Sequence, residues 1–113
     1  MKIQIRKLSE KAKIPVKSHT DDAGYDLFAT SKQILIGKYI EYSTGIAMAI
    51  PVGYVGLIFP RSSIRDKKLI LSNCVGVIDP GYIGEIKASF RMLHKPNEAI
   101  LEDIYDVGDK CCQ

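Results

Sequence analysis

The sequence predicts an all-β fold, a barrel or a sandwich, with at most one short helix. Apolar and polar residues alternate with a period of two in most apolar segments. Turn-forming residues separate these segments at short intervals, and no stretch of a dozen residues carries the apolar stripe of an amphipathic helix. A chain of 113 residues fits one domain, so residues 1–113 are expected to form a single unit.

Seven extended segments follow one another along the chain. They are residues 2–8, 38–50, 54–59, 69–71, 75–78, 85–93 and 99–104. Gly45 interrupts the second segment, and Pro or Gly lies in most of the connections. The helical candidate is residues 62–67, where Ser63 and Asp66 fit an S-x-x-D capping pattern.

Composition and charge are those of an ordinary globular protein. The chain is 46% apolar and 26% charged with a mean hydropathy near zero, which excludes a disordered and a membrane-spanning chain. Its net charge of +3 is small and dispersed, so no nucleic-acid partner is expected. The first residues lack the continuous apolar stretch of a signal peptide. We therefore expect no membrane partner and a cytoplasmic location, or a nuclear one in a eukaryote or virus.

The cysteines and histidines favour neither a metal site nor a nucleophile. Three cysteines, two of them adjacent and none in a C-x-x-C spacing, exclude a disulfide framework and a zinc site. They are expected to be small buried apolar residues, with Cys74 inside an apolar strand and without a base partner. His19 and His94 are distant in sequence and lie among loop residues, so a metal pair or a catalytic dyad is not predicted.

The segment Asp79-Pro80-Gly81-Tyr82 has two interpretations. The simpler one is a tight turn, because Asp, Pro and Gly suit successive turn positions. The functional one uses the same geometry. A carboxylate held at the end of an apolar strand can orient and deprotonate a water, while the tyrosine ring packs against a flat ligand.

Two further segments carry polar side chains suited to a phosphate and its cation. Pro60-Arg61-Ser62-Ser63 ends a strand and predicts a serine N-cap, and the same free N–H groups, hydroxyls and guanidinium form an anion cradle. Asp21 and Asp22 fit a solvated loop. Asp26 is tethered to an ordered strand and is a candidate to help hold a hydrated Mg²⁺, which needs only one or two carboxylates.

Three segments in this order resemble the first three signature motifs of the trimeric deoxyuridine triphosphatases (dUTPases). They are Ala23-Gly24-Tyr25-Asp26-Leu27, Pro60-Arg61-Ser62-Ser63 and the run GVIDPGYIGE at 76–85. Residues 108–113 resemble the opening of the fourth motif, so the resemblance covers essentially the whole chain. It implies a distorted jelly-roll β-barrel that assembles as a homotrimer with active sites shared between subunits.

The resemblance implies hydrolysis of dUTP to dUMP and pyrophosphate, which keeps uracil out of DNA and supplies dUMP for dTMP synthesis. Asp79 then contacts the ribose and orients the water that attacks the α-phosphorus in line. Tyr82 lies against the deoxyribose and leaves no room for a 2′-hydroxyl.

The other implied contacts divide between the base and the phosphates. Uracil is read mostly by backbone groups of a hairpin, with one lysine on the adjoining strand; the residues are Asn73, Gly76, Val77, Ile78 and Lys87. The phosphate chain is held by Arg61, Ser62 and Ser63, and Gln113 helps to order the phosphates or the water. Mg²⁺ bridges the phosphates, and Asp26 reaches it through water.

One feature departs from the family pattern. The family continues past its fourth motif into a glycine-rich tail whose phenylalanine closes over the uracil, and none of Phe28, Phe59 and Phe90 lies in such a segment. A tail left out of the sequence, a truncated or frameshifted product and a genuinely short homologue all account for this. Without the tail, closure over the phosphates is expected to be weak and turnover slow. One alternative function is therefore a catalytically impaired homologue that binds the nucleotide.

The other alternative is dCTP deaminase, which shares the barrel, an Arg-Ser-Ser segment and an Ile-Asp-Pro-Gly-aromatic turn. The catalytic glutamate of that enzyme falls at Ser89, and the arginine that usually precedes its Ile-Asp falls at Val77. Both differences favour the hydrolase.

Overall fold

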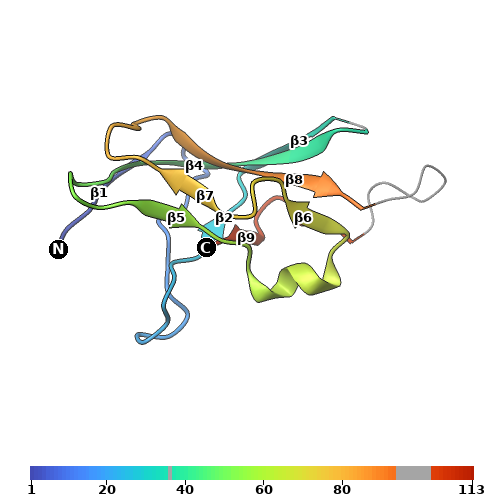
Figure 1. Ribbon diagram of the computed structural model, residues 1–113, viewed down its shortest axis with the longest axis horizontal. Coiled ribbons are helices and arrows are strands. Elements are labelled where there is room, and N and C mark those ends of the chain that lie inside the picture. Colours follow the sequence, from blue (N-terminus) through green and yellow to red (C-terminus); the bar gives the residue numbers. More distant parts are fainter. Residues whose placement is uncertain (36, 94–102) are drawn as a thin grey trace.

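An antiparallel sheet of five strands organises the chain around its longest strand, β4 (Tyr39–Ala49) (Figure 1). The computed structural model describes residues 1–35, 37–93 and 103–113. The other strands of this sheet are β1 (Gln4–Lys7), β3 (Ser31–Leu35), β6 (Leu69–Leu71) and β8 (Glu85–Met92). The main path runs β1-β4-β8-β6, and β3 pairs with β4 beside it.

Two small antiparallel sheets complete the architecture. One pairs β5 (Gly56–Ile58) with β7 (Gly76–Ile78), and the other pairs β2 (Leu27–Phe28) with β9 (Lys110–Cys112). The second sheet draws the C-terminus into the middle of the molecule (Figure 1). The fold is the all-β jelly roll that was predicted, with a single short helical element in the described residues.

Gly45 lets β4 serve two neighbours on one edge. Residues before it pair with β3, those after it pair with β1, and the pairing with β8 is irregular between Ser43 and Ala47. Gly45 has φ +67°, and a Cβ there would lie 2.8 Å from the Cβ of Ala12. A side chain is excluded by both conformation and space, so the glycine determines where the strand bends.

The core lies on one face of β4 and β8. Tyr42 and Phe90 are fully buried and pack edge to face with ring centroids 5.6 Å apart. The Tyr42 hydroxyl donates a 2.8 Å hydrogen bond to the carbonyl of Tyr105, and burial raises the pKa of Tyr42 well above its ordinary value. The buried hydroxyl of Thr44 donates to the carbonyl of Ile86 at 2.6 Å. The two buried hydroxyls therefore both have a partner.

Six of the seven predicted extended segments contain a strand of the structure, with shifts of a few residues at their ends. Of the seventh, residues 99–102 lie outside the described part of the chain. Asp103 and Ile104 form a bend, and Asp103 has φ +58°. The predicted extended segments do not include β2, β3 and β9, although Asp26, immediately before β2, was expected on an ordered strand. Two of the three are only two or three residues long, and β9 contains two buried cysteines in succession.

The short helix expected at residues 62–67 is present as a 3₁₀-helix, Ser62–Asp66. Two local predictions were wrong. The helix is preceded by Arg61 and has no serine cap, because the Ser63 hydroxyl contacts the Tyr105 hydroxyl at 2.9 Å instead. Cys74 is exposed in the turn between β6 and β7 with φ +62°, where its N–H donates to the carbonyl of Leu71. The closing of this tight turn, rather than apolar packing, determines its position.

The burial of the other two cysteines is confirmed. Cys111 and Cys112 are fully buried in β9, with their sulfurs 4.0 Å apart. The hydrogen bond between the two thiols, and then burial, raise the pKa of Cys112 far above its ordinary value. Cys112 is therefore held as a neutral thiol. His94 lies outside the described residues. In the part of the chain that the structure describes, no helix is both long and apolar enough to cross a membrane.

Candidate functional site

The β5–β7 pair presents the segment that sequence analysis assigned to a ligand base. Gly56 stands opposite Ile78, and Ile58 stands opposite Gly76. A Cβ on Gly56 would lie 2.9 Å from the Cβ of Ile78, so the glycine allows the two strands to pack closely. The pair has no further strand beside β7 among the described residues, which leaves the outer edge of β7 unpaired.

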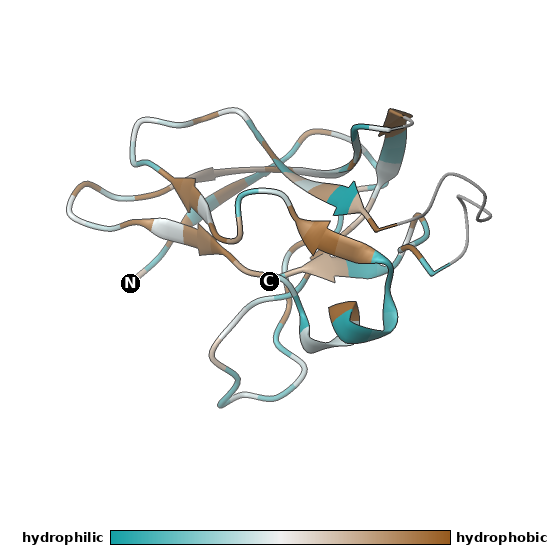
Figure 2. Cartoon of the chain, turned by 45° about the vertical axis from the view of Figure 1, so that its right-hand side comes forward, coloured by the Kyte–Doolittle hydropathy of each residue, from teal (hydrophilic) through white to brown (hydrophobic). Residues whose placement is uncertain are grey.

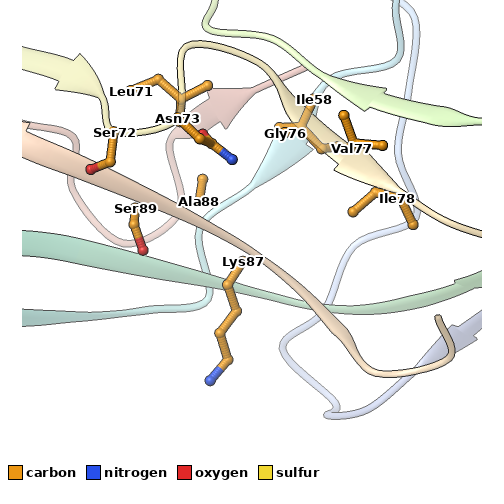
Figure 3. Close-up of a pocket in the computed structure, with 10 residues that line it drawn as sticks. All are labelled: Ile58, Leu71, Ser72, Asn73, Gly76, Val77, Ile78, Lys87, Ala88 and Ser89. Atoms are coloured by element: carbon orange, nitrogen blue, oxygen red, sulfur yellow. The ribbon is translucent and has the colours of Figure 1, made fainter.

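A cavity of about 300 Å³ lies between this pair and β8. Five predicted residues contribute to its wall, and Figure 3 shows Asn73 entering from the turn before β7 and Lys87 extending from β8. The complete lining is Ile58, Leu71, Ser72, Asn73, Gly76, Val77, Ile78, Lys87, Ala88 and Ser89. Apolar side chains and a few polar groups together are typical of a small-ligand site.

A second cavity, of about 320 Å³, adjoins the first. Val77, Ile78 and Lys87 line both, and the second adds Asp79 and Tyr82. Its remaining lining residues are Glu41, Glu85 and Ile86. The structure therefore brings the predicted base-binding segment, the predicted catalytic carboxylate and the predicted sugar-binding ring to one continuous surface.

The turn after β7 fixes the carboxylate and the ring relative to each other. The N–H of Tyr82 donates to the carbonyl of Asp79 at 3.0 Å, as the turn prediction required, and Asp79 is exposed. The Tyr82 hydroxyl donates to the carbonyl of Glu85 at 2.6 Å. A Cβ on Gly84 would lie 2.9 Å from Cζ and Oη of Tyr82, so the ring rests over the backbone of this glycine.

Sequence reasoning missed Glu41, which faces the same cavity from β4. Its Oε1 lies 3.6 Å from Nζ of Lys87, and its Oε2 accepts a 3.1 Å hydrogen bond from the Ser89 hydroxyl. Glu41 and Ser89 are direct cross-strand partners. Glu41 could have been identified only from the register in which β4 pairs with β8, and that register cannot be read from the sequence.

Of the predicted phosphate residues, Arg61 contacts a different centre, the carboxylate of Asp26. Asp26 is 6% exposed. Its Oδ1 accepts a 2.9 Å hydrogen bond from Nε of Arg61, and Nζ of Lys110 lies 3.3 Å from its Oδ2. The Ser18 hydroxyl also reaches Oδ2, at 3.4 Å. Arg61 and Asp26 are thus directly paired, and Lys110 and Ser18 are additions that sequence analysis did not single out.

The other members of this group lie alongside. Ser62 is exposed, and Ser63 is bound to Tyr105, whose pKa burial raises above its ordinary value. Gln113 exchanges backbone hydrogen bonds with Phe59 at 2.7 and 2.9 Å. Its side-chain Nε2 donates to the carbonyl of Pro60 at 3.4 Å. The end of the chain is therefore attached directly to the Pro60-Arg61 segment.

The side chains around Asp26 do not fit a magnesium ion held by the protein. Both of its oxygens already face cations, and a third cation there would be repelled. Across residues 1–35, 37–93 and 103–113, no cluster of three or more His, Cys, Asp or Glu side chains is present that could ligate a metal. The water-mediated contact predicted for Asp26 stays a prediction.

The two groups of predicted residues are separate within one chain. Neither cavity is lined by Arg61, Ser62, Ser63 or Gln113. Among the residues that the structure describes, no side-chain hydrogen bond or ion pair joins this group to Asp79 or Tyr82. Within one chain, the residues predicted to bind the base and sugar (the base-and-sugar surface) and those predicted to bind phosphate therefore lie on distinct parts.

Comparison with known proteins points to one family. A family model described as dUTPase matches residues 10–100. Deoxyuridine 5′-triphosphate nucleotidohydrolase of Nocardia farcinica is 42% identical over 100 residues, which cover 87% of this chain and 60% of the relative. That of Corynebacterium diphtheriae is 47% identical over 87 residues, covering 75% of this chain and 57% of the relative. The chain spans less than two thirds of the length of these relatives.

Solved structures agree with this comparison. The dUTPase from phage phi11 of S. aureus superposes with a TM-score of 0.82 at 28% identity, covering 99% of this chain and 86% of the phage chain. The dUTPase of Staphylococcus bacteriophage 80alpha gives 0.81 at 26% identity, covering 98% and 86%. A mutant of the phi11 protein coordinates a structural Mg(II) ion. It superposes with a TM-score of 0.81 at 28% identity, covering 99% of this chain and 87% of the mutant chain.

Proposed function

The chain belongs to the dUTPase family, and from that premise we propose that it hydrolyses dUTP to dUMP and pyrophosphate. The observation that supports this most directly is the pair of adjoining cavities that share Val77, Ile78 and Lys87. One offers an unpaired strand edge, and the other offers a carboxylate and a tyrosine ring. These are groups suited to the base and the sugar of a deoxynucleoside.

The edge of β7 is proposed to bind uracil. Uracil presents an acceptor, a donor and a second acceptor along one side, and the edge of a strand presents alternating N–H and C=O groups. A backbone N–H that meets O4 of uracil would face the amino group of cytosine, and two donors cannot satisfy each other. Asn73 and Lys87, on the wall of the same cavity, supply further donors.

Asp79 and Tyr82 are proposed to act at the sugar and the attacking water. The Asp79 carboxylate accepts a proton as the water oxygen bonds to the α-phosphorus. The bond from this phosphorus to the oxygen bridging the α- and β-phosphates breaks, and pyrophosphate leaves. The Tyr82 ring, held by Glu85 and Gly84, lies against the deoxyribose where a 2′-hydroxyl would need space.

The phosphate chain is proposed to lie on Arg61, Ser62, Ser63 and Gln113. A guanidinium and hydroxyls donate charge-assisted hydrogen bonds to phosphate oxygens. Mg²⁺ enters this proposal only as a partner of the triphosphate oxygens and water, since the described side chains do not form a site for it. The binding of dUTP in Mg²⁺ and in EDTA measures how far the ion contributes.

A homotrimer with shared active sites is proposed because the two surfaces of one chain are separate. Exposed apolar side chains lie on the face of β5 and β7 that points away from the core, and Figure 2 colours these two strands from white to brown. Leu57 and Val77 are cross-strand partners on this face, 44% and 61% exposed, and Phe59 is 42% exposed. Contact with another subunit would cover these side chains and place a second chain next to the base-and-sugar surface.

The decisive experiment measures pyrophosphate release from dUTP by the purified chain and by Asp79→Asn. We expect Asp79→Asn to lower kcat by about 100- to 10,000-fold while binding of α,β-imido-dUTP is retained. Asp106→Asn serves as a control, since Asp106 is 79% exposed and lies on neither cavity. If the wild-type chain releases no pyrophosphate yet binds the imido analogue, the impaired nucleotide-binding homologue is the correct assignment.

The dCTP deaminase alternative is tested separately. Ser89 stands where that enzyme needs a glutamate, but the Glu41 carboxylate lies 3.1 Å from the Ser89 hydroxyl. Glu41 is also paired with Lys87. Incubation with dCTP should release no ammonia, and ammonia that disappears in Glu41→Gln would instead establish the deaminase.

The cellular role that follows is removal of dUTP before polymerases use it, together with supply of dUMP for dTMP synthesis. The relatives that the chain resembles come from bacteria such as Nocardia farcinica. A cytoplasmic setting and a single domain over residues 1–113 are parts of the same proposal.

A further inference from the structure

Asp26 joins two cations that come from distant parts of the chain. Arg61 follows β5, and Lys110 begins β9, yet they contact opposite oxygens of the same buried carboxylate at 2.9 and 3.3 Å. Ser18 bridges the arrangement, because its hydroxyl lies 3.4 Å from Oδ2 of Asp26 and 3.1 Å from Nζ of Lys110. A buried carboxylate with several partners is a fixed point rather than a mobile surface charge.

Backbone pairing holds Asp26 and Lys110 next to each other. Asp26 exchanges backbone hydrogen bonds with Val16 at 2.6 and 3.2 Å, immediately before β2. Lys110 is the cross-strand partner of Phe28, and its ammonium also lies 5.9 Å from the centre of the Phe28 ring. The lysine therefore reaches Asp26 from the neighbouring strand, and its side chain is only 29% exposed.

This arrangement leaves the two terminal amino groups of Arg61 available to a ligand. Arg61 uses Nε to bind Asp26, and no described contact involves its terminal amino groups. An arginine fixed through Nε presents those two amino groups as a fork, the geometry that binds phosphate. One carboxylate between two cations also leaves a net charge of +1, which favours an anion at this place.

We propose that Lys110 is a positioning residue for the phosphate chain of the substrate, and that it acts through Asp26 on Arg61. Without Lys110, the second oxygen of Asp26 loses its cationic partner and keeps only the Ser18 hydroxyl, so Arg61 can turn to share both oxygens with its terminal amino groups. Those groups would then be lost to phosphate. Asp26 accordingly orients Arg61 rather than binding a metal. The inference rests on the proposed function, since it assumes that Arg61 contacts the nucleotide phosphates.

The test compares a phosphate-rich ligand with one that has no phosphate. Binding of α,β-imido-dUTP and of 2′-deoxyuridine is measured by titration calorimetry for the full chain, with Mg²⁺ and with EDTA. Lys110→Met should weaken the binding of the imido analogue about 10-fold, equivalent to about 1.4 kcal/mol. The affinity for deoxyuridine should stay within about 2-fold of the wild type. Lys110→Arg, which retains the charge, should restore most of the loss. Lys32→Met is the matched control, because Lys32 is 28% exposed and pairs with Asp106 away from Arg61.

The outcomes separate the inference from the proposed function. Equal weakening of both ligands would show a general structural role, and a loss seen only with Mg²⁺ would return Asp26 to a metal role; either overturns the inference. A wild-type chain that binds neither ligand refutes the proposed function and the inference with it. If Lys110→Met does not fold, Ser18→Ala replaces it. This variant should weaken only the binding of the imido analogue, by about 3-fold. If the ratio of the two dissociation constants stays as in the wild type, the inference is overturned.

Discussion

Gly84 gives the Tyr82 ring the space in which it lies, so its replacement by alanine should impair the proposed reaction. A Cβ at position 84 would lie 2.9 Å from Cζ and Oη of Tyr82, whereas ordinary contacts of a Cβ begin at 3.4 Å. The ring must therefore move by about half an ångström or more. Gly84 does not have a positive φ, so the alanine acts through the ring and not through backbone strain.

The size of the effect follows from what the ring loses. Displacement lengthens the 2.6 Å hydrogen bond from Tyr82 to the carbonyl of Glu85, which contributes about 1 kcal/mol. A misplacement of about 1 Å at a reacting site costs up to about 100-fold, so kcat/KM for dUTP should fall about 10- to 100-fold. UTP should lose less, because the ring no longer excludes its 2′-hydroxyl. Tyr82 is 44% exposed, so the free energy of unfolding should change by less than about 1 kcal/mol.

Pyrophosphate release from dUTP and from UTP measures both quantities. Gly81→Ala is the control, since Gly81 lies in the same loop and a Cβ there meets nothing within 4 Å. Tyr82→Phe separates loss of the hydrogen bond from movement of the ring. A Gly84→Ala chain with the activity and the dUTP preference of the wild type would refute the reasoning, as would an equal loss in Gly81→Ala.

Three further variants probe stability and assembly. Gly45→Ala should lower the free energy of unfolding by about 3 kcal/mol in urea titrations, because the new side chain both strains a left-handed backbone and overlaps Ala12. Gly53→Ala is the control: its φ is +88° but the space around it is open, so the free energy of unfolding should fall by only about 1 kcal/mol. The raised pKa of Tyr42 means that above its ordinary value of 10 the unfolded chain releases a proton that the folded chain keeps. The free energy of unfolding should therefore fall as the pH rises above about 10, and more steeply in the wild type than in Tyr42→Phe. Urea titrations at several pH values measure this, and equal pH dependence in the two chains would count against the account. Leu57→Asp places a charge on the exposed apolar face of β5 and should shift sedimentation from trimer towards monomer; an unchanged trimer would exclude that face from the interface.

Most of the long strands could be predicted because their sequences respond to local constraints. In β8 the burial alternates residue by residue from Glu85 to Met92, and the sequence shows the same alternation. β6 matches its predicted bounds. The Asp79-Pro80-Gly81-Tyr82 turn was predicted from residue preferences that operate over four positions, and the hydrogen bond from Tyr82 to Asp79 confirms it.

The missed features depend on partners that are far away in the sequence. Glu41 lies in a cavity because β4 and β8 pair in one register. β9 is a strand because β2 pairs with it. The Ser63 hydroxyl was predicted to cap a helix, but Tyr105 occupies it. None of these partners is within reach of local sequence patterns.

Local sequence patterns were enough to predict the all-β class and the turn that holds Asp79, since both depend on periodicity and on neighbouring residues. The contacts expected with a deoxynucleotide came from the resemblance of three motifs to the dUTPase family. How those residues combine depends on pairing between strands that are distant in the sequence. The tertiary structure joined Val77, Asp79 and Tyr82 on adjoining cavities, and it assigned Asp26 to Arg61 and Lys110. The physical reason is that a buried carboxylate takes whichever cations the fold brings within about 3 Å, and strand pairing over more than eighty residues brings Lys110 there.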